Sequence, residues 1–192
     1  MKKEVLVFIF DGYADWESAY VCAELNAPDT QYTIKTLSFD RKIKVSMAGF
    51  KVLPDYSIEE LPDDFSLLIL TGGYAWMKQL NNAVLPVVEY AVKRKIPVAA
   101  ICNAANFMAQ HGYIDQIRHS GNTLLFMKEQ APAYKGENYF LEKQAVCDKN
   151  IITANGSASL EFAKEILLLM KAKPVADVLK WYTLHKDGFY PE

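Results

Sequence analysis

The chain has 192 residues, 51% of them apolar, and a formal net charge of −2. This length suits a single domain over residues 1–192, built from a sheet and covering helices. The nearly balanced charge shows neither the basic patch of a nucleic-acid-binding protein nor an acidic tail. Small molecules or protein surfaces are therefore the expected partners, and nucleic acid is not. We expect the substrate to be a small molecule or a peptide.

The ends and the cysteines favour a cytoplasmic protein. The apolar run at residues 5–10 is interrupted by Asp11 and has no small-residue cleavage site after it, so it predicts a first strand rather than a signal peptide. No apolar stretch approaches the roughly 20 residues that cross a bilayer. Cys22, Cys102 and Cys147 lie far apart and lack metal-ligand spacing. We expect no membrane association, no metal and no cofactor.

The first elements are a buried strand at 5–10, a loop at 11–15 and a helix from 16 to about 26. Asp15 is a plausible N-cap of that helix, and its apolar residues recur at helical spacing. Glu17 falls in the first turn, where the helix dipole favours a carboxylate. That structural role is the simplest explanation of Glu17 taken alone.

A strand at 32–37 follows, then a ribbon at 45–53 with its turn at Gly49, a connection at 54–62 and a second buried strand at 65–70. The second strand ends in Thr71-Gly72-Gly73. Gly72 and Gly73 permit the backbone to approach a ligand and expose N–H groups that suit an oxyanion site. A tight turn is the alternative.

A helix at 84–95 leads into a short apolar strand at 96–101, and helix-compatible residues begin at Asn103. Cys102 therefore lies on a strand-to-helix turn, with alanines two positions to either side, as in a nucleophile elbow. The unpaired N–H groups and dipole of a helix N-terminus favour a thiolate, so the pKa of Cys102 is expected to fall. The alternative is a buried cysteine that packs as a small hydrophobe.

The remaining third is predicted to hold strands at 119–126, 140–146 and 151–153 and a helix at 159–170. His111, at the end of the helix after Cys102, is expected to be a cation favoured by the helix dipole. From about residue 174 the chain is rich in aromatic residues. We expect this tail to pack across the domain or against a second subunit.

Strands that alternate with helices of this length predict a doubly wound α/β fold with parallel pairing. Ligands of such sheets lie beyond the carboxyl ends of the strands. The loops after the strands at 5–10, 65–70 and 96–101 share that edge. Glu17, the Gly72–Gly73 pair and Cys102 are therefore predicted to share one crevice.

Four motifs in a fixed order point to one protein family. They are Asp15-Trp16-Glu17, Leu70-Thr71-Gly72-Gly73, Ala99-Ala100-Ile101-Cys102 and Thr153-Ala154-Asn155-Gly156. Over roughly residues 3–171 the chain resembles the DJ-1/PfpI family of the class I glutamine amidotransferase-like superfamily. It is most similar to the YdeA-like group of intracellular cysteine proteases or amidases, including the stretches His119-Ser120-Gly121-Asn122 and Gly188-Phe189-Tyr190. The resemblance implies a flavodoxin-like three-layer sandwich with a mainly parallel central sheet and a nucleophile elbow at Cys102.

The resemblance also implies roles for single residues. Cys102 matches the elbow cysteine, and Glu17 matches the acid whose protonated carboxyl hydrogen-bonds the sulfur. The backbone N–H groups of Gly73 and Asn103 match the oxyanion donors, with Gly72 beside them. Burial and like-charge repulsion next to a thiolate would keep the carboxyl protonated. Family members are commonly dimers, so a cytoplasmic homodimer is expected.

Several residues depart from the family pattern. Protease-like members carry a histidine immediately after the cysteine, where this chain has Asn103, which cannot act as a general base. Other members supply a histidine at the position of Asn122. His119 is the best candidate for a base, but on an extended strand its odd offset from Asn122 points it to the opposite face. His185 is the only histidine of the C-terminal third, and no complete triad is visible.

Three functions are compatible with these features. In the first, the Cys102 thiolate adds to a carbonyl or aldehyde, in a hydrolase of the protease or amidase type or in a glyoxalase- or deglycase-like enzyme. Lacking a visible base, such a protein favours addition over peptide cleavage. The second is a redox-responsive protein of the stress response whose Cys102 becomes a sulfinate. The third is a small-molecule binding module with little turnover. The loops at 74–76 and 126–138 are expected to line the pocket.

Overall fold

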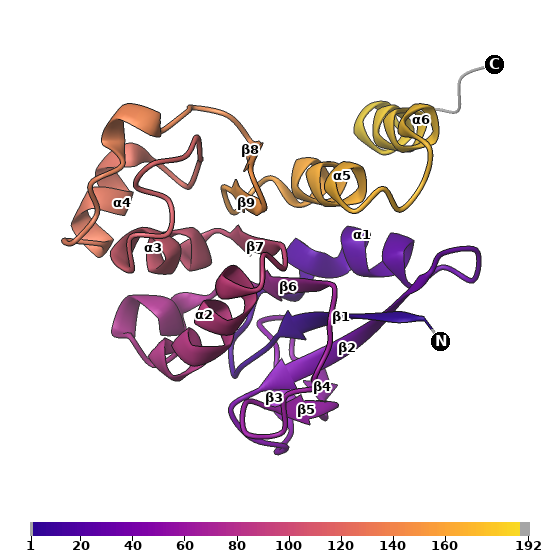
Figure 1. The fold of residues 1–192 in the computed structure, drawn as a ribbon, viewed down its shortest axis with the longest axis horizontal. Helices are drawn as coiled ribbons and strands as arrows, with labels where there is room; N and C mark the ends of the chain where they lie inside the picture. Colours follow the sequence, from indigo (N-terminus) through magenta and orange to yellow (C-terminus); the bar gives the residue numbers. More distant parts are fainter. Residues whose placement is uncertain (1, 189–192) are drawn as a thin grey trace.

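The computed structural model describes residues 2–188. Figure 1 shows a central seven-stranded sheet in the order β5-β2-β1-β6-β7-β9-β8, parallel except for β8, which runs antiparallel to β9. The strands are β1 (Lys3–Phe8), β2 (Tyr32–Ser38), β5 (Tyr56–Ser57), β6 (Leu67–Leu70), β7 (Val98–Ile101), β8 (Ala145–Asp148) and β9 (Ile151–Ala154). The predicted α/β class with a mainly parallel sheet is confirmed.

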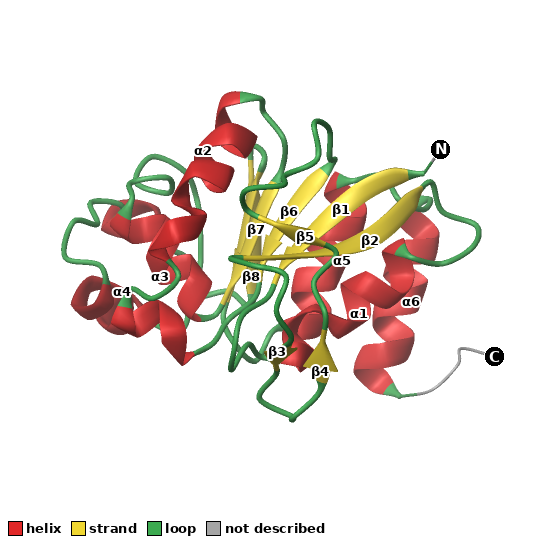
Figure 2. Cartoon of the chain, turned by 90° about the horizontal axis from the view of Figure 1, so that it is seen from below, coloured by secondary structure: helices red, strands yellow, loops and turns green. Residues whose placement is uncertain are grey.

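Helices cover both faces of the sheet, which gives three layers (Figures 1 and 2). On one side lie α1 (Asp15–Leu25) and α5 (Ser159–Leu169), with α6 (Val175–Asp187) packed on α5. On the other lie α2 (Leu85–Lys93) and α3 (Asn103–Gln110), with α4 (Leu124–Gln130) beside α3. Short 3-10 helices are η1 (Tyr74–Lys78), η2 (Asn82–Val84) and η3 (Glu137–Tyr139), and a small antiparallel ribbon consists of β3 (Lys44–Val45) and β4 (Lys51–Val52).

The central strands are apolar because helices cover them on both faces. Every residue of β6 and β7 is buried. Their register is aligned, since Phe8 pairs with Leu70, Leu70 with Ala100 and Ile101 with Ala154. The loops after β1, β6, β7 and β9 therefore leave the sheet at one edge, as the sequence predicts.

The strand predicted at 119–126 is wrong. The segment makes one isolated bridge, His119 to Phe140, and then enters α4, whose N-cap hydroxyl, that of Thr123, accepts a hydrogen bond of 3.1 Å from the Phe126 N–H. A threonine three residues ahead of a backbone donor is an N-cap signal that outweighs the apolar run after it. The strand predicted at 140–146 is also misplaced, because pairing with β9 begins at Ala145.

The start of the first helix differs from the prediction by one residue. Ala14 occupies the N-cap position and makes no side-chain cap. The carboxylate of Asp15 instead accepts a hydrogen bond of 3.3 Å from the Ala48 N–H in the turn of the β3–β4 ribbon. Asp15 therefore joins the ribbon to α1 rather than capping the helix.

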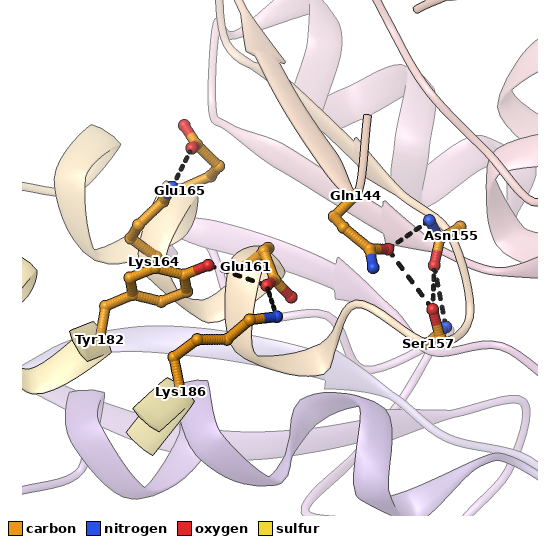
Figure 3. Close-up of polar contacts among 8 residues, drawn as sticks. All are labelled: Gln144, Asn155, Ser157, Glu161, Lys164, Glu165, Tyr182 and Lys186. Atoms are coloured by element: carbon orange, nitrogen blue, oxygen red, sulfur yellow. Dashed lines mark hydrogen bonds and ion pairs between the residues drawn. The ribbon is translucent and has the colours of Figure 1, made fainter. Parts of the chain in front are cut away.

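The region after residue 174 is mostly helix, and polar contacts hold it to α5. Glu161 of α5 accepts hydrogen bonds from the Tyr182 hydroxyl at 2.9 Å and from the Lys186 ammonium at 2.8 Å (Figure 3). Trp181 packs edge-on against Tyr20 of α1, with ring centroids 6.2 Å apart. These contacts agree with the expected packing across the domain.

The C-terminal residues and the membrane-crossing character of the helices complete the comparison with the sequence-based predictions. Phe189 and Tyr190, which belong to the predicted aromatic tail, lie outside the described residues. Within residues 2–188, no helix combines the length and the apolar character needed to cross a membrane.

Candidate active site

The backbone turns sharply at Cys102, between β7 and α3. Its φ is 60° and its ψ is −127°, a strained conformation for a residue other than glycine. The Cys102 N–H donates to the Ala154 carbonyl at 2.9 Å and its carbonyl accepts from the Ala105 N–H at 3.1 Å. Bonds to β9 on one side and to α3 on the other hold the predicted elbow geometry.

Glu17 is brought to the same place by the first turn of α1. Its side chain is 1% exposed, and its Oε2 accepts a hydrogen bond of 2.6 Å from the Gly72 N–H. Hydrogen bonding to Cys102 acts on the pKa of this carboxyl, which places the two side chains together. The structure thus joins Glu17, Gly72 and Cys102, as the sequence predicts.

Two glycines allow this close approach. A Cβ added at Gly72 would lie 2.5 Å from Glu17 Oε2 and 2.6 Å from Cys102 Cβ. A Cβ at Gly156 would lie 2.9 Å from the Cys102 sulfur. Any larger residue at either position would push the acid or the sulfur away.

Asn122 contacts the sulfur from the segment before α4. Its Nδ2 lies 3.7 Å from the Cys102 Sγ, and its Oδ1 accepts a hydrogen bond of 2.9 Å from the Gly156 N–H. The amide therefore offers a donor to a thiolate and fixes the loop on the other side of it. This position suits the predicted role of Asn122 beside the site.

The loop after β9 that carries Gly156 has its own polar network, drawn in Figure 3. The Asn155 Nδ2 donates to Gln144 Oε1 at 2.6 Å, and its Oδ1 accepts from the Ser157 hydroxyl at 2.8 Å and the Ser157 N–H at 3.0 Å. Sequence reasoning assigned these residues no role. The signals in the sequence were the motif Thr153-Ala154-Asn155-Gly156 and the place of its glycine beyond a strand end, at the sheet edge where ligands bind.

The electrostatics contradict one prediction. Burial raises the pKa of Glu17 to about 7, with the Gly72 N–H and the Cys102 bond opposing the shift. Burial and the Glu17 charge raise the pKa of Cys102 to about 11, against the bonds from Asn122 and the Asn103 N–H. The expected fall in the Cys102 pKa is wrong, because desolvation and a carboxylate outweigh the start of a short helix.

Glu17 and Cys102 are best described as one titrating pair. Because the two groups interact directly, the values of about 7 and about 11 belong to the pair. Between about pH 7 and about pH 11 the two side chains together hold a single proton. Either Cys102 is a thiol beside a carboxylate, or it is a thiolate that accepts a hydrogen bond from a protonated Glu17. The second form is the nucleophile.

No histidine lines the site. His119 is 0% exposed, with its ring nitrogens bonded to the Ile117 carbonyl and the Tyr134 hydroxyl, so the structure does not bring the expected candidate base to Cys102. Burial lowers its pKa, which keeps it neutral. His185 is exposed and bonds the Trp181 carbonyl. No Cys-His-acid triad forms.

A pocket of about 360 Å³ opens at the sulfur. Its lining is mostly apolar and includes Tyr74 and Phe126, which belong to the loops expected there. Further lining residues, which the sequence did not indicate, are Ala14, Trp16, Met47 and Met77. Three of them carry large apolar side chains that are partly exposed: Trp16 at 49%, Met47 at 38% and Met77 at 42%. The pocket suits a substrate with an apolar or aromatic portion.

The predicted oxyanion donors also line this pocket. Gly73 and Asn103 both face it, and the Asn103 side chain donates to the Gly73 carbonyl at 3.2 Å. Among the described residues the Gly73 N–H has no hydrogen-bond partner, whereas the Gly72 N–H is occupied by Glu17. Gly72 therefore positions Glu17 and is not a free donor, in contrast to its predicted role.

Comparison with known proteins identifies a family and several similar chains. The DJ-1/PfpI family matches residues 3–169. The chain is 38% identical to a Bacillus subtilis protein named uncharacterized protease YdeA, over 98% of this chain and 93% of that protein. It is 32% identical to uncharacterized protease YoaZ of the same organism, over 96% of this chain and 91% of that protein.

Solved structures share the fold. The thiJ/pfpI family protein from Bacillus anthracis superposes with a TM-score of 0.91 at 33% identity, covering 98% of this chain and 92% of that one. The flavodoxin-like arrangement predicted from the sequence is thus confirmed.

Proposed function

The chain belongs to the DJ-1/PfpI family, and from this premise and the geometry at Cys102 we propose that it is a cysteine-dependent hydrolase of the amidase or protease type. The observation that carries the proposal is that Cys102 and Glu17 lie together in the lining of an apolar pocket of about 360 Å³, where burial raises the pKa of Glu17 to about 7. Relatives that match nearly the whole chain are named proteases.

The first step uses the pair with its proton on Glu17. The Cys102 thiolate forms a bond to the carbonyl carbon of an amide, and the π electrons of the carbonyl move to its oxygen. The N–H groups of Gly73 and Asn103 donate to that oxyanion. The Glu17 proton passes to the amide nitrogen, the C–N bond breaks, and the amine leaves behind a thioester and an ionised Glu17.

The second step returns the pair to its starting form. A water molecule attacks the thioester carbon and gives a proton to the Glu17 carboxylate, while the C–S bond breaks and releases the thiolate. Glu17 is the side chain of the pocket lining whose pKa, about 7, suits both proton transfers. One carboxyl thus takes the roles that a histidine has in other cysteine enzymes.

An aldehyde substrate needs only part of this series of reaction steps. The thiolate adds to the aldehyde carbon, and Glu17 passes its proton to the oxygen, giving a hemithioacetal without a leaving group. Since no histidine lines the pocket, addition of this kind requires less of the site than peptide cleavage. Glyoxal-type aldehydes are therefore included among the candidate substrates.

The redox-responsive role is the weaker alternative. Peroxide reacts with the thiolate, and the raised pKa of Cys102 keeps that form a minority unless Glu17 holds the proton. A sulfur that only senses oxidants has no need of an apolar pocket. The single-domain organisation, the homodimer, the cytoplasmic location and a role in stress remain predictions.

The test compares Cys102→Ala with Cys147→Ala on a panel of aryl amides and methylglyoxal. Cys147 is a matched control, because it is also a free, half-buried cysteine whose pKa burial raises to about 11, and it does not line the pocket. We expect Cys102→Ala to lose about a thousandfold or more in kcat/KM and Cys147→Ala to stay within about twofold.

Mass spectrometry during turnover should show the acyl or hemithioacetal adduct on the peptide that contains Cys102. Turnover that survives in Cys102→Ala would refute the proposal. Oxidation of Cys102 to the sulfinate by equimolar peroxide, with no turnover of any panel member, would favour the redox alternative.

A further inference from the structure

A second, more enclosed cavity of about 80 Å³ lies beside the Cys102 pocket, between η1 and α3. Its polar lining comes from amide and imidazole side chains, among them Asn103, Asn106, Gln110 and His111. Among residues 2–188, no lysine, arginine, aspartate or glutamate is part of this lining. The cavity is therefore polar and uncharged, unlike the mostly apolar pocket at Cys102.

Asn106 is the distinctive residue of this cavity. Its side chain is 5% exposed, and neither Oδ1 nor Nδ2 has a hydrogen-bond partner among the described residues. Native proteins rarely leave a whole amide unsatisfied, because each such atom loses its bonds to water on burial. An Asn106 that lines a cavity thus presents one acceptor and one donor, side by side, to whatever fills it.

His111 adds a third polar atom. Its Nε2 is buried without a partner among the described residues, and its ring lies on Phe107 with centroids 4.6 Å apart. Burial lowers its pKa, so the expectation that His111 is a cation at the end of the helix is wrong. A neutral imidazole keeps the lining free of charge.

The apolar walls limit how a ligand can be placed. Phe107 and Trp76 both line the cavity, and the Trp76 indole N–H is already donated to the Thr71 carbonyl at 2.8 Å. Trp76 therefore offers only apolar surface. The volume has room for roughly three water molecules or for one group of a few heavy atoms.

We propose that this cavity binds a small neutral carboxamide, whose adjacent carbonyl and N–H₂ pair with the two atoms of the Asn106 amide. A carboxylate of the same shape offers no donor to the Asn106 carbonyl oxygen and finds no cation in the lining. An ammonium group finds no anion there. Complementary hydrogen bonds thus select a primary amide over either charged group of similar size.

The two cavities are neighbours, because Met77 and Asn103 line both. The Asn103 amide donates to the Gly73 carbonyl at 3.2 Å and accepts from Asn122 Nδ2 at 3.4 Å. A carboxamide in the polar cavity would lie behind the same residue whose N–H faces the oxyanion. The binding inference does not require Cys102 to be a catalyst, so it can hold when the proposed function fails.

Acetamide is the probe, with acetate as the isosteric control. The titration is followed by NMR at the Asn106 side-chain N–H₂ and the His111 imidazole signals. We expect saturable shifts of both signals with acetamide and none of that kind with acetate. The Cys102→Ser variant should bind acetamide as the natural chain does, which separates this result from the test of hydrolysis.

The variant Asn106→Leu replaces the amide with an apolar group of similar shape and should weaken acetamide binding by at least about tenfold. Asn81→Leu is the matched control: Asn81 is 1% exposed and both of its amide atoms lack partners among the described residues, but it does not line the cavity. We expect it to bind within about twofold of the natural chain.

Three outcomes would overturn the proposal, two of them measured in solution. One is non-saturable or equal response to acetamide and acetate in the natural chain, a result that does not depend on whether any variant folds. The other is equal binding by Asn106→Leu and the natural chain. A crystal soaked in acetamide that holds only water against Asn106 would likewise contradict it.

Discussion

The pKa values of two buried glutamates in this chain are shifted in opposite directions. Glu17 is 1% exposed and Glu161 is 8% exposed. Burial raises the pKa of Glu17 to about 7. Burial also acts to raise the pKa of Glu161, but hydrogen bonds from Lys186 and Tyr182, together with the Lys186 charge, outweigh it and lower the pKa.

The two carboxyls differ in depth of burial and also in their neighbours, and only Glu161 has a cation as a hydrogen-bond donor among the described residues. Glu161 joins α5 to α6 through a cation and a phenol, so its carboxylate is satisfied and structural (Figure 3). Glu17 has one backbone N–H and a sulfur, and no cation bonds it. An acid that is buried without a counter-charge keeps its proton near neutral pH and can transfer it.

Replacing Glu17 with glutamine should have the largest effect. Because the pKa is raised in the folded chain, from an ordinary 4.5 to about 7, the natural protein loses stability as pH rises through this window. The loss is roughly 3 kcal/mol above pH 7, from about 2.5 pKa units at 1.36 kcal/mol each. Glu17→Gln should escape it, so urea unfolding at pH 9 should show a more stable variant.

Urea unfolding of the natural chain and of Glu17→Gln at low pH provides the control. Below pH 4.5 the carboxyl is protonated in both folded and unfolded chains, so the stability gap should vanish there. A gap that does not change with pH would mean that the raised pKa of Glu17 is not its source.

Glu17→Gln should also change the thiol. The Glu17 charge is one of the causes that raise the pKa of Cys102 to about 11, and glutamine carries none. The midpoint of Cys102 alkylation with iodoacetamide should therefore move to lower pH in the variant, by roughly one unit. Equal midpoints in the two proteins would contradict contact between the two side chains.

An alanine at Gly72 tests the geometry of the pair. The added Cβ would meet the Glu17 carboxyl and Cys102 Cβ at less than 3 Å, so the variant should lose about 1–3 kcal/mol in unfolding free energy and the linkage between the two titrations. Gly121→Ala is the control, because the only close contact of its Cβ is the flexible tip of Met127, at 2.6 Å, and the next atoms lie at 3.8 Å and 3.9 Å. Chemical denaturation of both should show a clear loss in Gly72→Ala alone.

Glu161→Gln should have the smallest effect and the opposite pH dependence. The pKa of Glu161 is lowered in the folded chain, so its contribution is present above pH 4.5 and is lost as pH falls through the lowered value. The variant should be modestly less stable at pH 7, since Lys186 is half exposed, and equal to the natural chain in acid. Thermal melts across pH 3–8 would show this, and a variant more stable at pH 7 would contradict it.

The sequence predicted most of the fold because its strong signals are local. Apolar runs mark the buried strands, and their shared carboxyl edge places Glu17, Gly72 and Cys102 together. The segment at 119–126 is an exception. Its apolar residues fit a strand, but the Thr123 cap stabilises a helix there. The wrong expectation for His119 as a base has the same origin. Its hydrogen-bond partners, Ile117 and Tyr134, belong to the same irregular region.

The chemistry of the site was harder to predict than its location. The sign of the Cys102 pKa shift depends on how deeply the pair is buried, which no local pattern reports. The polar cavity at Asn106 was also missed. Asn106 lies in a helix in which residues 103–109 are all buried, but burial of that asparagine requires the packing of η1 against α3.

The central claim is that Glu17 keeps a proton beside Cys102 at neutral pH. A carbon-13 NMR titration of glutamate-labelled protein, with Glu17→Gln used to assign the signal, measures this directly. We expect the Glu17 carboxyl to titrate near pH 7 and its signal to move again when Cys102 ionises. A single titration near the ordinary value of 4.5 would contradict it.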